Sequence, residues 1–92
     1  MIDNYTQNKI LSKFILRMDK SYSSFFYFTL EANENICFYS TLPHEKGQRY
    51  RDIVVYTTPE LRKVFINILQ HCKKNQEIEV LLDTEICDTS HP

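Results

Sequence analysis

The sequence predicts a two-layer α+β sandwich whose elements follow the order β-α-β-β-α-β. Four short segments carry the two-residue apolar period of strands, and two longer segments carry the helical period. The chain's one glycine, Gly47, lies between the second and third strand-like segments, where a hairpin is needed. Ninety-two residues with 42% hydrophobic and 25% charged content suit one domain with one core. We expect this domain over residues 11–83, with flexible polar termini at residues 1–10 and 84–92.

The first strand is expected over residues 13–18, because apolar and polar side chains alternate there. Phe14, Leu16 and Met18 would face the core, and Lys13, Ile15 and Arg17 the other side. A helix is predicted over residues 20–34, since Asp19 and Ser21 are both suited to accept hydrogen bonds from a first helical turn. Its apolar stripe would comprise Tyr22, Phe25, Phe26, Thr29, Leu30 and Ala32 or Asn33, with Tyr27 and Phe28 partly exposed.

A second strand over residues 36–42 would end at Pro43, and a third would return over residues 49–56. The second would turn Ile36, Phe38 and Leu42 to one face and Cys37, Tyr39 and Thr41 to the other. Gly47 is predicted to adopt a positive φ in the hairpin. The facing of the third strand stays open, because a one-residue bulge would exchange the pair Ile53 and Val55 with the pair Val54 and Tyr56.

The second helix carries the strongest local signal. Thr58 suits an N-cap and Pro59 the first helical position. Its apolar stripe would comprise Leu61, Val64, Phe65, Ile68, Leu69 and Cys72. In the last strand Ile78, Val80 and Leu82 would point inward, and Glu77, Glu79 and Leu81 outward.

These elements define a ferredoxin-like sandwich: both helices on one face of a four-stranded antiparallel sheet with the spatial order 4-1-3-2. The other face would remain open and unusually apolar. Its candidate interface residues are Ile15, Tyr39, Val54, Tyr56 and Leu81, with Cys37 beside them.

Several short motifs resemble a family of uncharacterised bacterial proteins, a domain of unknown function. They are Phe28-Thr29-Leu30-Glu31-Ala32, Glu34-Asn35-Ile36, Ser40-Thr41-Leu42, Gly47 and Pro59-Glu60. The resemblance spans residues 13–75 and implies a ferredoxin-like or ACT-like arrangement without an assigned activity. The chain departs from the family at Thr57-Thr58, where a second proline is expected before Pro59.

Three explanations of the open face compete. It is an ordinary surface, a homodimer interface, or a platform for single-stranded RNA. The RNA hypothesis would use Tyr39, Tyr50 and Tyr56 for stacking and Lys13, Arg17, Lys46, Arg49 and Arg51 for phosphates. Glu77, Glu79, the net charge of −1 and the pI of 6.3 disfavour a nucleic-acid partner. We favour a homodimeric binding or regulatory module without catalysis of its own, which associates through this face or a strand edge.

Small-molecule sensing or an enzyme is the third hypothesis. The turn at residues 18–22 lacks the glycine that would let backbone N–H groups approach a ligand, and its serines, Ser21, Ser23 and Ser24, more ordinarily cap a helix. Glu31, Glu34, Ser40 and Thr41 form the candidate polar site. No catalytic residue, metal ligand or cofactor is predicted, because His44, His71 and His91 have no local partner at ligand spacing.

The cysteines and the hydropathy predict a cytoplasmic protein that does not enter a membrane. Cys37, Cys72 and Cys87 match neither a disulfide framework nor a zinc motif, so reduced thiols are expected. The N-terminal sequence lacks the plan of a secretory signal, and no apolar run approaches the roughly 18 to 20 residues of a membrane span.

Overall fold

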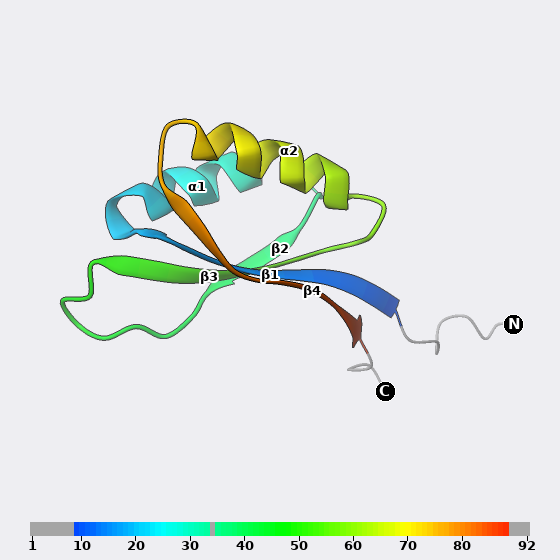
Figure 1. Cartoon of the computed structure of the whole chain (residues 1–92), viewed down its shortest axis with the longest axis horizontal. Helices are drawn as coiled ribbons and strands as arrows, with labels where there is room; N and C mark the ends of the chain where they lie inside the picture. The colour runs from blue at the N-terminus through cyan, green and yellow to red at the C-terminus, as the bar shows by residue number, and fades with distance from the viewer. Residues whose placement is uncertain (1–8, 34, 89–92) are drawn as a thin grey trace, which may run out of the picture.

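A computed structural model describes residues 9–33 and 35–88, and its elements follow the predicted order (Figure 1). The strands are β1 (Lys9–Asp19), β2 (Phe38–Thr41), β3 (Tyr50–Thr57) and β4 (Ile78–Asp88), and the helices are α1 (Lys20–Ala32) and α2 (Arg62–Lys73). The antiparallel sheet has the spatial order β2-β3-β1-β4. This is the predicted order 4-1-3-2 viewed from the opposite edge, so the ferredoxin-like fold is confirmed.

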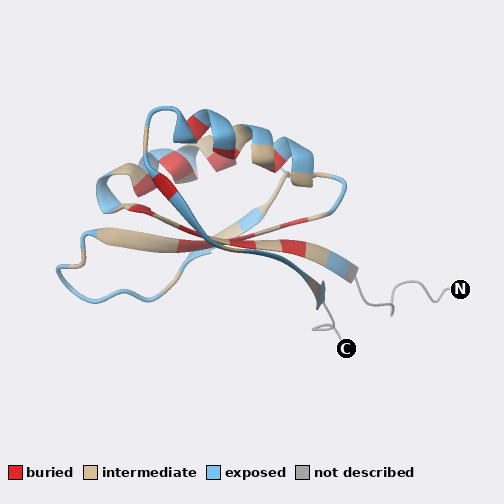
Figure 2. Ribbon diagram, in the orientation of Figure 1, coloured by how far each residue is buried: buried red, intermediate tan, exposed pale blue. Residues whose placement is uncertain are grey.

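The core lies between the sheet and the two helices, which cover the same face (Figures 1 and 2). From β1, Phe14, Leu16 and Met18 point into it, each at most 2% exposed. The alternation in residues 13–18 therefore predicted this face correctly. Ile53 and Val55 of β3 lie opposite Leu16 and Phe14, which decides the facing that the sequence left open.

Each helix buries a narrower stripe than predicted. α1 buries Ser23, Phe26 and Leu30, and α2 buries Phe65, Leu69 and Cys72. Phe25 and Val64, both predicted to be in the stripes, are 57% and 42% exposed, because they lie at the rim of each helix's contact with the sheet. Tyr27, predicted at the margin, is half-buried against the core.

The helix ends follow local side-chain chemistry. Asp19 caps α1 by accepting a hydrogen bond from the Ser21 N–H at 2.8 Å. α1 ends at Ala32, and Asn35 adopts a φ of 69°, as Asn tolerates well. Thr58 accepts from the Leu61 N–H within a separate turn, so α2 begins later than predicted, at Arg62. Gly47 has the predicted positive φ, 87°.

The first and the last strand of the chain are longer than predicted. β1 begins at Lys9 and β4 continues to Asp88, so residues 9–10 and 84–88, predicted to be flexible, belong to the sheet: 9–10 pair with 87–88, and 84–86 pair with 11–13. The backbone pairing between β1 and β4 holds these segments in the sheet although their apolar pattern is weak. A β-bulge at Leu81 separates the pairs Leu16↔Val80 and Ile15↔Leu82. Beyond it Leu82 shares a face with Ile15, so its predicted core position is wrong.

The predicted facing of β2 is also wrong. Tyr39 lies opposite Val55 and therefore faces the helices, whereas Phe38 lies opposite Tyr56 on the open face and is 78% exposed. The reason is an aromatic contact with α1: the Tyr39 ring stacks on Tyr27, with ring centroids 4.9 Å apart. Cys37, predicted on the open face, packs against the core instead.

Candidate functional site

Three chain connections meet at one end of the sheet. Because β1 and β3 are antiparallel, Asp19 at the end of β1 lies opposite Tyr50 at the start of β3, and Met18 lies opposite Ile78 of β4. The β1–α1 junction, the β2–β3 loop and the α2–β4 turn are therefore neighbours. The Lys20 N–H donates to the Arg49 carbonyl at 2.9 Å and fixes the first two against each other.

A surface cavity of about 640 Å³, here called the junction cavity, opens between these connections. It is lined by Arg17, Met18, Asp19, Ser21, Arg49, Tyr50, Gln76, Glu77 and Glu79. A second cavity of about 300 Å³ adjoins it and is lined by Asp19, Lys20, Ser21, Gly47 and Arg49. The two cavities share Asp19, Ser21 and Arg49. The two cations of the second cavity, Lys20 and Arg49, therefore lie beside the junction cavity.

Arg17 is a rigid cation in the wall of the junction cavity. Its Nε and Nη2 donate to the two carboxylate oxygens of Asp52 at 2.8 and 2.9 Å, and its guanidinium lies 3.9 Å from the centre of the Tyr50 ring. The hydrogen bond with Arg17 lowers the pKa of Asp52, and the same contact raises the pKa of Arg17. The pair therefore stays ionised at neutral pH, with Arg17 stacked on an aromatic ring.

The N-terminus of α1 is occupied by its own cap. The Asp19 carboxylate accepts from both the N–H and the hydroxyl of Ser21, and these hydrogen bonds lower the pKa of Asp19. The Ser23 hydroxyl donates to the Lys20 carbonyl at 2.8 Å. Ser21 and Ser23 are therefore first-turn serines whose hydroxyls donate within the turn, and the cap itself is Asp19. Lys20 and Arg49 are exposed beside this cap, and Glu77 and Glu79 are exposed in the wall of the junction cavity.

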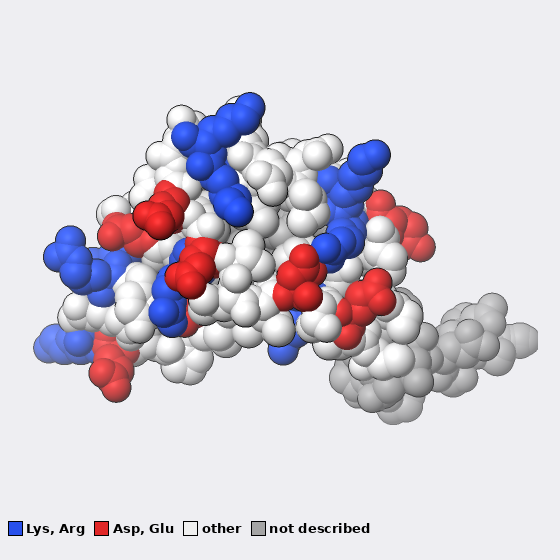
Figure 3. Space-filling view, in the orientation of Figure 1, with Lys and Arg blue, Asp and Glu red and all other residues white. Residues whose placement is uncertain are grey.

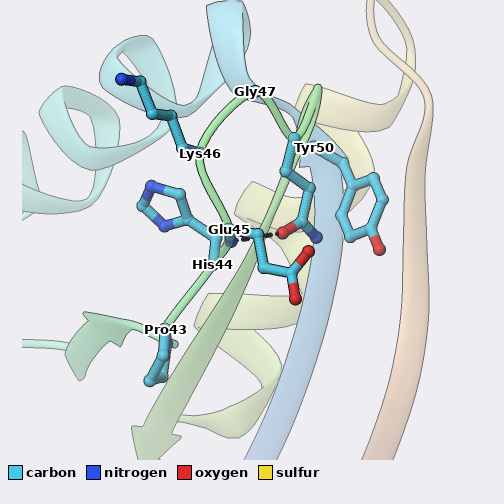
Figure 4. A pocket seen from close by; sticks show the side chains of 7 residues that line it. Pro43, His44, Glu45, Lys46, Gly47 and Tyr50 are labelled. Atoms are coloured by element: carbon cyan, nitrogen blue, oxygen red, sulfur yellow. Dashed lines mark hydrogen bonds between the residues drawn. The ribbon is translucent and has the colours of Figure 1, made fainter.

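The β2–β3 loop encloses a third cavity of about 670 Å³ (Figure 4). It is lined by Pro43, His44, Glu45, Lys46, Gly47, Gln48 and Tyr50. Its shape is held by two hydrogen bonds, from the Glu45 N–H to the Gln48 side chain at 2.8 Å and from the Gln48 N–H to the Glu45 carbonyl at 3.0 Å. The His44 and Lys46 side chains extend away from the loop (Figure 4), so this loop offers no converging set of ligand groups.

The open face has an apolar end, away from the junction. A cavity of about 370 Å³ is lined by Leu11, Phe38, Tyr56 and Ile86. A smaller one of about 190 Å³ shares the first three of these residues and extends towards Cys37 and Leu61. No charged residue lines either cavity. This end of the sheet is the most apolar concave surface among the described residues.

The structure places three of the five predicted interface residues on the open face. Ile15, Val54 and Tyr56 lie on the open face, and Leu81 lies at the bulge with 40% exposure. Tyr39 faces the helices. Sequence reasoning missed Leu11, Phe38, Leu82 and Ile86 on the open face. Only knowledge of the strand registers would have found them.

The predicted polar site is not assembled. Glu31 accepts a hydrogen bond from the Tyr39 hydroxyl, and Thr41 is hydrogen-bonded to Tyr27, both beside α1. Ser40 points to the opposite face, next to Val54. Glu34 lies outside the described residues.

The proposed RNA platform is divided as well. Lys13, Arg17, Tyr50 and Tyr56 share the open face, but Tyr39 lies on the other side. Arg51, opposite Met18, donates to the carbonyls of Gln48 and Tyr50. The structure therefore gives this hypothesis fewer stacking and phosphate-binding groups than the sequence suggested.

The titratable groups provide no evident catalytic centre. Burial raises the pKa of the Cys37 thiol to about 11, so it is protonated at neutral pH and a poor nucleophile. Within residues 9–33 and 35–88, no three His, Cys, Asp or Glu side chains group closely enough to hold a metal ion. Neither helix that the structure describes is long and apolar enough to span a bilayer.

Comparisons with known proteins identify the fold. No family model matches the chain, and no curated protein matches it. The chain does match solved structures of CPII from Thiomonas intermedia K12, a nitrogen regulatory PII-like protein. Its apo form has a TM-score of 0.71 and 12% identity, over 89% of this chain and 95% of CPII. CPII bound to ADP, AMP and bicarbonate has a TM-score of 0.68 and 13% identity, over 94% of this chain and 99% of CPII. The chain therefore has the ferredoxin-like fold of these PII-like proteins. At this identity the likeness extends to the fold alone.

Proposed function

We propose that this protein is a small regulatory module without catalysis of its own, which binds a small anionic metabolite in the junction cavity and acts as a homo-oligomer. The observation that carries the ligand proposal is the position of Arg49. Its guanidinium makes no ion pair within the described residues, although its charge helps to lower the pKa of Asp19, and it lies where all three connections meet, in a cavity that Glu77 and Glu79 also line. A cation held at such a place is suited to a phosphate or carboxylate.

The cavity also offers a flat surface. The Tyr50 ring and the Arg17 guanidinium stacked on it form a planar cationic pair beside Arg49. Such a pair favours a ligand that combines an anionic group with a planar ring. CPII, which shares the fold, has been solved with ADP, AMP and bicarbonate. An adenine nucleotide is therefore the ligand class to test first.

Self-association is supported by the open face. Its apolar end exposes Phe38 beside two uncharged cavities. At the junction end of this face the charged Arg17 is already paired with Asp52, so a second copy could cover this area without leaving those two charges unpaired. The sequence predicted a homodimer, and we propose self-association without fixing the number of copies. A measurement of molecular mass in solution would determine that number.

The ligand proposal is tested by titrating ¹⁵N-labelled protein separately with ADP, AMP and bicarbonate. We expect saturable shifts for a nucleotide at Asp19, Lys20, Arg49 and Gln76. Arg49→Gln should weaken binding about tenfold, since a charge-assisted hydrogen bond contributes roughly 1.5 to 3 kcal/mol.

Lys46→Gln is the matched control, because it removes the same charge from the same loop outside the junction cavity. It should change affinity less than about twofold. Absence of saturable shifts with all three compounds, or equal losses in both variants, would contradict the ligand proposal.

A further inference from the structure

The outer surface of α1 is unusual for a helix in water. Phe25 and Phe28 are 57% and 67% exposed, and no charged residue lies between Lys20 and Glu31. The Tyr22 ring packs against Phe25, with centroids 5.5 Å apart, so Phe25 is held in place. Single exposed apolar residues are common on protein surfaces, but two phenylalanines one turn apart on an uncharged helix face form a patch.

α2 continues this patch and adds charge. The Tyr22 hydroxyl of α1 lies beside the Cys72 thiol of α2, which identifies the side of α2 that faces α1. Val64, eight residues earlier, lies about 80° around the helix from Cys72, at the edge of the buried stripe, and it is 42% exposed. From Leu61 to Asn75 there is no acidic residue, and the lysines, Lys63, Lys73 and Lys74, are all exposed. Figure 3 shows Lys and Arg side chains over the helices, whereas Asp and Glu lie mainly lower, beside the strands.

We propose that this helix-layer patch, formed by Phe25, Phe28, Val64, Lys63 and Lys74, docks an acidic amphipathic helix of a partner protein. Such a helix presents an apolar stripe flanked by carboxylates. The stripe would cover Phe25, Phe28 and Val64, and the carboxylates would meet the lysines of α2. The inference rests on the proposed regulatory role, which requires a target, and it uses none of the residues of the junction cavity.

The charge of the patch decides against other occupants. A second copy of the same patch would bring lysines against lysines, which is unfavourable. An anionic membrane is typically recognised by clusters of about four to eight basic residues. α2 and its C-cap expose three lysines, Lys63, Lys73 and Lys74, and the remaining cation of the helix, Arg62, is paired with Asp83. An acidic helix of modest charge is the occupant that matches both the apolar and the basic parts.

The test uses the full chain, ¹⁵N-labelled, and a synthetic 18-residue amphipathic peptide with a leucine stripe and glutamates elsewhere. A peptide with lysines in place of the glutamates is the charge control. We expect saturable shifts on α1 and α2 with the acidic peptide only. The double variant Phe25→Ser/Phe28→Ser should weaken binding about tenfold or more, since two exposed aromatic side chains would be removed.

A second double variant, Lys63→Glu/Lys74→Glu, keeps the aromatic residues and tests the charge requirement independently of folding. It should also lose affinity for the acidic peptide, while Lys46→Glu on the β2–β3 loop should retain it. Equal binding of both peptides, shifts confined to the sheet, or binding of phosphatidylserine vesicles in place of the peptide would overturn the proposal. All peptide titrations are run without nucleotide. Failure of the junction cavity to bind ADP therefore does not affect the peptide result, and failure of the peptide to bind does not affect the nucleotide result.

Discussion

Among individual residues, Ser12 is the clearest case of an interaction that the fold leaves unmade. Its side chain is fully buried on β1, and its hydroxyl has no hydrogen-bond partner among the described residues. The other buried hydroxyls are satisfied: Ser23 donates to the Lys20 carbonyl and Thr57 to the Ile36 carbonyl, at 2.8 and 2.5 Å. A buried hydroxyl without a partner costs about 1 to 3 kcal/mol of folding free energy.

Ser12→Ala should therefore stabilise the protein. The substitution removes the unpaired hydroxyl and leaves the methylene in place, so we expect the free energy of unfolding to rise by about 1 kcal/mol. Urea denaturation followed by circular dichroism measures it. Ser23→Ala is the matched control and should lower stability by a similar amount, because its hydroxyl is bonded. A loss of stability in Ser12→Ala would show that this hydroxyl is satisfied in solution.

Among the elements, β4 combines length with a single irregularity. It pairs with β1 from Ile78 to Asp88, and the one extra residue, Leu81, is accommodated as a bulge. On either side of the bulge the register is regular. Arg62 of α2 donates to both carboxylate oxygens of Asp83 at 2.9 and 2.8 Å, which joins the helix layer to the strand just past the bulge.

Deletion of Leu81 should preserve the fold, since Val80 and Leu82 already lie opposite the adjacent residues Leu16 and Ile15. The strand would become regular while every other side chain kept its face. We expect a change in the free energy of unfolding of no more than about 2 kcal/mol. Deletion of Ile15 is the control: it shifts one half of β1 to the opposite face and should abolish cooperative unfolding. Loss of the native two-dimensional NMR spectrum on deletion of Leu81 would refute this role of the bulge.

The elements also show how far sequence reasoning reaches. β1 was predictable because one face, from Phe14 to Met18, is fully buried and imposes strict alternation. β2 was not, since each of its faces carries one aromatic and one hydroxyl residue, and its orientation depends on the stacking of Tyr39 on Tyr27 from α1. The bulge at Leu81 leaves no local signal. The junction cavity combines side chains from three connections, so its composition follows from strand register and not from any motif.

At the scale of the whole molecule, one sheet face is covered and the other is not. The helices bury the inner face, while Phe38, Tyr56, Leu11 and Ile86 remain at the outer one. A sheet of four strands about 4.8 Å apart, paired over roughly eight residues of about 3.3 Å, covers on the order of 500 Å² in projection. This approaches the roughly 800 Å² that each partner buries in a standard interface.

The purified protein should therefore scatter light as an oligomer, and a charge on the open face should dissociate it. Tyr56→Glu would place a carboxylate in the contact opposite Lys13, and both charges would have to be desolvated there. We therefore expect the dissociation constant to rise more than about tenfold. Phe38→Asp should act in the same way. Phe28→Asp makes the same change on the helix layer and should leave the mass unaltered. If the wild-type protein is monomeric, the proposed contact is excluded. If Phe28→Asp dissociates the oligomer while Tyr56→Glu leaves it assembled, the contact lies elsewhere.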